Sequence, residues 1–113
     1  MAPEPGTTQA STEAAIAGDW PAVTELLRRI PLHEMMQLTI VDGGPPLVMT
    51  MELTDAVRGP TEGTVHGGML ATLADVSSAL SLRSALEPTE IPVTTDIHLR
   101  YYRQPKGGPI TAA

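Results

Sequence analysis

The stretch from residue 67 to about 86 constrains the fold most, because it predicts a long helix that is apolar around most of its circumference. Gly67 and Gly68 begin it and Pro88 follows its end. One broad side of this helix carries Met69, Leu70, Leu73, Val76, Leu80 and Leu86. The opposite stripe consists mostly of small residues and contains Asp75. Other structure normally covers such a helix, so we expect Asp75 to lie in a pocket and not on the free surface.

Three further segments predict an antiparallel sheet around this helix. Residues 38–42 and 47–53 predict two strands joined by a turn of two glycines and two prolines. Residues 93–102 alternate strictly, which predicts one long strand with a buried and a wetter side. The alternation starts again near Ile110 and stops at Ala113, so we expect the sheet to be incomplete in this chain. The predicted class is α+β.

The N-terminal part divides at about residue 19. Residues 1–18 offer little to bury, and we expect a disordered tail there, followed by one domain over residues 19–113. Asp19 or Trp20 can cap a helix that has Pro21 in its first turn, and Arg28 with Arg29 suits a solvated end of that helix. Residues 33–36 predict a short helical turn.

Composition excludes several classes of function. A net charge of −6 and only three aromatic residues argue against nucleic-acid binding. The sequence has no apolar run of membrane-spanning length and no signal-like start, and it has no cysteine, so we expect a cytoplasmic protein that does not bind membranes. The spacing of His33, His66 and His98 suggests no zinc site, and we expect neither metal nor cofactor.

The chemistry-bearing residues lie around the start of the predicted long helix. The backbone N–H groups of Gly67 and Gly68 could bind a developing negative oxygen, helped by the helix dipole. Such donors lower acyl-transfer barriers by roughly 3–4 kcal/mol each. Asp75 could act as a general base on water or as a nucleophile on a carbonyl carbon. A tight loop with a structural acid is the alternative, and the short motif alone favours it.

The longer string Gly63-Thr64-Val65-His66-Gly67-Gly68-Met69-Leu70-Ala71-Thr72-Leu73-Ala74-Asp75 is more specific. It resembles the hotdog-fold thioesterases of the phenylacetate-degradation (PaaI-like) type, whose signature is Gly-x-x-His-Gly-Gly followed by a helix with Leu-Ala-Asp. Residues 32–41 and 93–99, with Tyr101 and Pro105, resemble flanking parts of the same family, and the resemblance spans about residues 20–113. It implies a curved antiparallel sheet wrapped round the long helix, a homodimer or a dimer of dimers, and hydrolysis of acyl-coenzyme A (acyl-CoA) thioesters.

The resemblance also implies roles for individual residues. Asp75 corresponds to the catalytic acid, Gly67 supplies the N–H for the thioester oxygen, and His66 supports the loop. Gly68 and Thr94 lie where substrate-contacting positions are expected, Thr94 at the place of a serine near the catalytic acid. In such proteins the acid and the oxyanion loop come from different subunits. By the alternation, Thr94 would reach Asp75 only through a bulge or from the neighbouring subunit.

Arg100 and Arg103 belong with Lys106 to the only basic cluster of an acidic chain. We expect Arg100 and Arg103 to meet the phosphates of CoA, because guanidinium groups bind phosphate with charge-assisted hydrogen bonds. A solvated strand end is an equally good interpretation of the cluster.

Two departures from the family pattern keep other functions open. Pro60 stands where many members have an asparagine that orients substrate or water, so Thr61 or Glu62 would have to replace it. The family also continues with further strands after a segment like residues 107–113. The alternatives to a thioesterase are therefore a module that binds or senses acyl-CoA without turnover, and an inactive truncated remnant.

Overall fold

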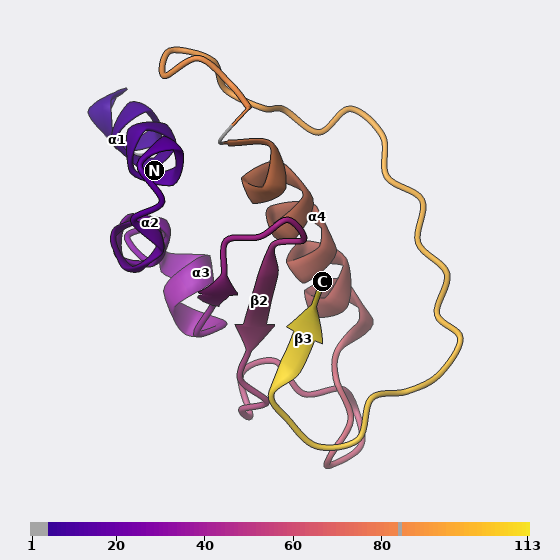
Figure 1. Ribbon diagram of the computed structural model, residues 1–113. Coiled ribbons are helices and arrows are strands. Elements are labelled where there is room, and N and C mark those ends of the chain that lie inside the picture. Colours follow the sequence, from indigo (N-terminus) through magenta and orange to yellow (C-terminus); the bar gives the residue numbers. More distant parts are fainter. Residues whose placement is uncertain (1–4, 84) are drawn as a thin grey trace.

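Two short strands, β1 (Thr39–Asp42) and β2 (Val48–Met51), form the antiparallel hairpin that the sequence predicts. The computed structural model describes residues 5–83 and 85–113. Strand β3 (Ile110–Ala112) pairs antiparallel with the other edge of β2, which gives the order β1-β2-β3 (Figure 1). Met49 and Met51 are fully buried and, being two residues apart, share one face of the strand.

The turn between β1 and β2 needs both of its glycines. A Cβ on Gly43 would lie 1.7 Å from the indole of Trp20, so the Trp20 ring covers the turn only because residue 43 has no side chain. Gly44 has a φ of +79°, and its N–H donates to the Asp42 carboxylate at 2.9 Å. The turn of the hairpin thereby packs against Trp20, the first residue of helix α2 (Trp20–Leu27).

Helix α4 (Gly67–Arg83) is the predicted long helix, and it lies against β2 and β3 (Figure 1). Leu73 and Leu80 are buried at one face, seven residues apart, as a 3.6-residue period requires. The stripe with Asp75 faces the other way, and Leu82 on it is 52% exposed. The helix is therefore covered on its sheet side and only partly on the stripe that carries Asp75.

Helix α2 (Trp20–Leu27) begins as predicted, with the Asp19 carboxylate accepting from Ala22 N–H at 3.2 Å. The prediction that Arg28 is part of a solvated helix end is wrong. Its guanidinium donates to Leu38 O and Thr39 Oγ1, each at 2.7 Å. These bonds fasten the end of α2 to the start of β1, since the free edge of β1 offers acceptors that an arginine can reach. Helix α3 (Pro31–Met35) lies between them in sequence and matches the expected helical turn.

The expected disordered tail over residues 1–18 is wrong over most of its length, because helix α1 (Pro5–Ile16) forms there. It packs against α2 and α4, with Thr12 and Ala15 buried. Composition misled here, since alanine-rich segments form helices without large apolar side chains, and small side chains permit close packing. Residues 1–4 of the predicted tail lie outside the described residues.

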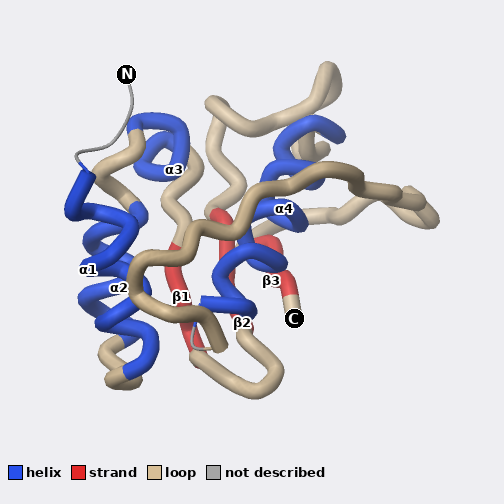
Figure 2. The backbone as a smooth tube through the Cα atoms, turned by 90° about the horizontal axis from the view of Figure 1, so that it is seen from above, coloured by secondary structure: helices blue, strands red, loops and turns tan. Residues whose placement is uncertain are grey.

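The predicted strand over residues 93–102 is also absent. Within the described chain, residues 91–106 make no backbone–backbone hydrogen bond. They form a long arc beside α4 (Figure 1), which also appears as unpaired loop in the view from above (Figure 2). A strand needs hydrogen bonds to a neighbouring strand, and this segment passes beside α4 without pairing with any strand of the β1-β2-β3 sheet. The fold is thus α+β, a small antiparallel sheet against one long helix, consistent with an incomplete hotdog architecture.

No helix among the described residues has both the length and the apolar character needed to cross a bilayer.

Candidate active site

His66 caps the N-terminus of α4 and organises the glycine pair. Its carbonyl accepts from Met69 N–H at 2.9 Å and from Leu70 N–H at 3.2 Å. Its ring Nδ1 lies 3.0 Å from the amide nitrogen of Gly68, so Nδ1 accepts and the neutral ring carries its proton on Nε2. His66 therefore caps the first turn with both its backbone carbonyl and its side chain.

The N–H of Gly67 is the amide of this first turn that remains for a ligand. In a trans peptide the C=O and N–H groups point in opposite directions, and the His66 carbonyl is directed into the helix. The Gly67 N–H consequently points out of the helix start, and no described residue accepts from it. The expectation that Gly68 offers a second such donor is wrong, because the His66 ring occupies its N–H.

Asp75 lies two turns further along α4 and is partly buried. Its Oδ1 accepts a short hydrogen bond from the hydroxyl of Thr94. Both residues line a hollow of about 270 Å³ between α4 and residues 92–97. Thr94 reaches Asp75 of the same chain because residues 93–102 do not form a sheet strand, so their side chains need not alternate between two faces.

A second hollow, of about 360 Å³, adjoins Gly67 and is lined by Val65, Gly67, Leu70, Tyr101, Tyr102, Arg103 and Gln104. Two side chains from residues 101–104 hold the start of α4 and the loop before it. The phenol of Tyr101 donates to Gly67 O at 3.0 Å, and Gln104 Nε2 donates to Val65 O at 3.2 Å. Neither contact was expected from the sequence. No local pattern indicates a contact that spans 34 residues.

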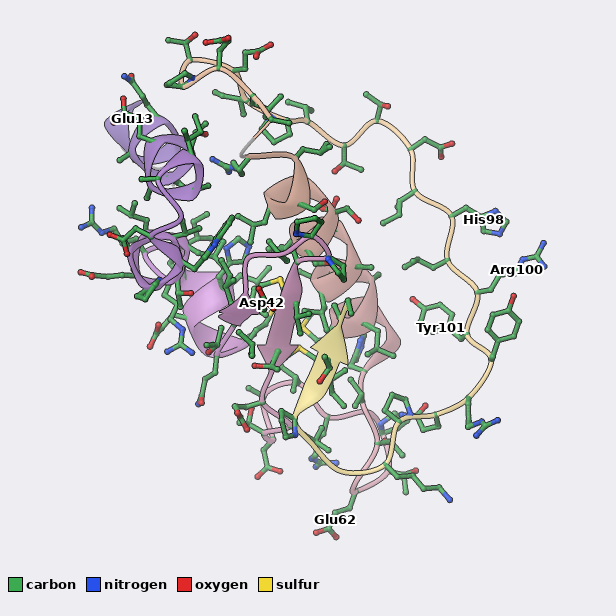
Figure 3. All side chains as sticks on the ribbon, in the orientation of Figure 1. Glu13, Asp42, Glu62, His98, Arg100 and Tyr101 are labelled. Atoms are coloured by element: carbon green, nitrogen blue, oxygen red, sulfur yellow. The ribbon has the colours of Figure 1, made fainter. Side chains whose placement is uncertain are left out.

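The remaining predicted site residues fall into different places. Arg103 lines the hollow beside Gly67, whereas Arg100 and His98 point away from the body of the molecule (Figure 3). Glu62 points into solvent at the outer end of its loop (Figure 3), which does not suit it to replace the family asparagine. Pro60 and Thr61 are exposed on the same loop.

Gly67 and Asp75 do not converge within one chain. Eight residues of α-helix separate them, which is about 12 Å along the axis. They also border different hollows. A larger hollow of about 640 Å³ lies beside Trp20, the β1–β2 turn and the serines of α4, and it contains none of the predicted site residues.

Within residues 5–83 and 85–113, no cluster of three or more histidine or acidic side chains is arranged to hold a metal ion.

Comparison with known proteins gives two matches. Residues 62–113, which include the glycine pair and Asp75, match the sequence model of the Thioesterase superfamily. The chain is also 37% identical over 91 residues to a protein of Halobacterium salinarum that has been provisionally named an esterase. This match covers 79% of the chain but 48% of the relative, so the chain spans about half the length of the curated protein that it matches. No solved structure matches the chain significantly.

Proposed function

We propose that this chain is part of a hotdog-fold hydrolase that cleaves acyl-CoA thioesters to the free acid and CoA. The observation that carries the proposal is the start of α4. There, a histidine cap leaves the Gly67 N–H directed outward, and an acid with a hydroxyl partner follows two turns later. The match of residues 62–113 to the Thioesterase superfamily and the similarity to a protein provisionally named an esterase support the reaction class.

The proposed reaction is an attack on the thioester carbonyl. In one route Asp75 takes a proton from water while the water oxygen bonds to the carbonyl carbon, and it later gives that proton to the departing thiolate. In the other route its carboxylate attacks that carbon directly, and water then hydrolyses the mixed anhydride left after C–S cleavage, which releases the free acid, restores Asp75 and supplies the proton for the thiolate. The carbonyl oxygen becomes negative and accepts from the Gly67 N–H. The C–S bond then breaks, and the CoA thiolate leaves and gains a proton. A donor fixed before the reaction is effective because no reorganisation is needed when charge develops.

The spacing along α4 bears on how the site is assembled. A single carbonyl cannot contact two groups that lie about 12 Å apart on one helix. We therefore propose that Asp75 of one copy works with Gly67 of a second copy, in a homodimer or a dimer of dimers. This arrangement agrees with the hydrolytic site that the sequence resemblance implies.

The hollow beside Gly67 suits the CoA end of the substrate. Arg103 lines it and is exposed, so its guanidinium can bind a phosphate without first breaking an ion pair. Arg100 lies further out on the same segment and would meet the more distant phosphates.

The test is release of free thiol from a panel of short, long and aromatic acyl-CoA substrates. Asp75→Asn removes the base but keeps the shape and the hydrogen-bond acceptor for Thr94, so kcat should fall about 10²–10⁴-fold. Asp55→Asn is the matched control, because the Asp55 side chain is fully exposed and does not line the hollow that Asp75 lines. Equal rates for the wild type and Asp75→Asn would overturn the mechanism.

A binding or sensing module without turnover is the second candidate, and Pro60 favours it. The side chain that would orient water is missing there, and Glu62 points away from the site. Calorimetric binding of acyl-CoA together with no thiol release across the whole panel would support this function instead.

A further inference from the structure

The Gly67–Gly68 peptide group is held at both of its ends. Its carbonyl accepts from the phenol of Tyr101 at 3.0 Å, and its N–H donates to Nδ1 of His66 at 3.0 Å. The preceding peptide group, which carries the Gly67 N–H, is held through the His66 carbonyl by the first amides of α4. The peptide groups on both sides of the Gly67 Cα are thus held by hydrogen bonds, whereas the Gly67 N–H itself donates to no described residue.

This restraint matters because glycines have the most backbone freedom of all residues. Two glycines in succession would let the Gly67 N–H vary in direction. An oxyanion donor is effective only when it already points at the place where charge develops. The hydrogen bonds from Tyr101 and to His66 restrict the backbone of Gly67 and Gly68, which have no side chains to restrict it.

The restraint from Tyr101 comes from a segment that has little else to hold it. Residues 91–106 make no backbone–backbone hydrogen bond within the described chain. Their side chains bind α4 and the loop before it at three points, through Thr94, Tyr101 and Gln104. Tyr101 lies on the side of the arc that faces the helix (Figure 3). The order of this segment and the order of the glycine pair are therefore coupled.

We propose that Tyr101 is a positioning residue for the oxyanion donor: its phenol holds the Gly67 carbonyl, and thereby fixes the direction of the Gly67 N–H. Gln104 assists by holding Val65 O, two residues earlier. The expected effect of Tyr101 on kcat rests on the proposed thioesterase function. The hydrogen bond itself can be tested without any activity.

The kinetic test compares Tyr101→Phe with Tyr102→Phe. Tyr102 lines the same hollow as Tyr101 and is 86% exposed, and its hydroxyl has no hydrogen-bond partner among the described residues, so Tyr102→Phe shows what loss of a phenol hydroxyl from this hollow does when no hydrogen bond to Gly67 is broken. Loss of one hydrogen bond that aligns the donor should lower kcat about five- to tenfold for Tyr101→Phe and leave KM within about twofold. An increase in KM at unchanged kcat would mean that Tyr101 contacts substrate, which overturns a positioning role.

The structural test uses protein labelled with ¹⁵N at its ten glycines. Phenylalanine keeps the ring, so Tyr101→Phe removes only the hydroxyl. The Gly68 amide shares its peptide group with the Gly67 carbonyl, so its resonance should shift and its hydrogen exchange should accelerate, with no change in Tyr102→Phe. A Gly68 amide unaffected by Tyr101→Phe would overturn the proposal whether or not the protein hydrolyses thioesters. A wild type without thiol release but with this shift would contradict only the proposed function.

Discussion

The three histidines of the chain lie in three different environments. His66 uses Nδ1 as an acceptor at the start of α4, and His98 is exposed and points away from the body. His33 is partly buried on α3, with Nδ1 3.3 Å from Leu27 O. Burial lowers the pKa of His33 below its usual value, because the charged ring loses hydration, and the hydrogen bond to Leu27 O offsets this only in part.

The lowered pKa of His33 makes stability depend on pH. The unfolded chain binds a proton to this residue at higher pH than the folded chain does. The free energy of unfolding therefore has its full value above the unfolded pKa, and decreases as the pH falls from there through the folded pKa. His33→Gln keeps a donor near Leu27 O but cannot be charged, so it should flatten this part of the profile in urea denaturation between pH 8 and 5.

His98→Gln is the control for this titration, since its ring is exposed. Its pH profile should run parallel to that of the wild type. A His33→Gln profile that also stays parallel to the wild type would contradict the assignment of this acid sensitivity to His33.

At the scale of elements, the sequence predicted those structures that depend on local contacts. Helices α2 and α4 follow from capping residues and from a 3.6-residue period, which any segment reveals on its own. The pattern of residues 93–102 is equally regular, yet a strand depends on a neighbour that the pattern does not describe. Helix α1 shows the converse: its weakly apolar sequence becomes helical because α2 and α4 provide a surface for it.

The contact between α2 and the hairpin depends on one missing side chain. A Cβ at residue 43 would overlap the Trp20 indole, so Gly43→Ala should displace that ring and destabilise the fold by about 1–3 kcal/mol, as overpacking does. Denaturant unfolding gives the value. In a Trp20→Leu background the same substitution should cost clearly less, because the overlapping ring is gone. Equal costs in both backgrounds would show that the strain does not come from Trp20.

At the scale of the whole molecule, the candidate site was only partly predictable. The sequence placed Gly67 and Asp75 on one helix, with His66 directly before its start, because their spacing along the chain fixes their spacing in space. Tyr101 and Gln104 were missed, since their contacts with Gly67 and Val65 depend on the path of residues 91–106 around α4. Arg100 and Arg103 are neighbours in the sequence but lie differently in the structure: Arg103 lines the hollow beside Gly67, and Arg100 points away from the body of the molecule.

The proposed sharing of the site between two copies predicts complementation of two inactive variants. Gly67→Pro deletes the proposed oxyanion donor and little else, because proline is well tolerated at the first position of a helix and has no N–H. Asp75→Asn deletes the proposed base. Each homodimer should be inactive in thiol release. In a mixed dimer, one of the two sites combines an intact Gly67 with an intact Asp75, so co-expressed chains should recover about a quarter of the wild-type activity.

Two features make this outcome specific to a shared site. If Gly67 and Asp75 acted within one chain, every site of the mixed dimer would carry one defect, and no activity would return. The matched control is a chain that carries both Gly67→Pro and Asp75→Asn. When this chain forms mixed dimers with the wild type, each of the two sites lacks one of the two groups. Recovery in the first mixture, together with inactive mixed dimers in the second, requires a carbonyl held between the α4 helices of two copies.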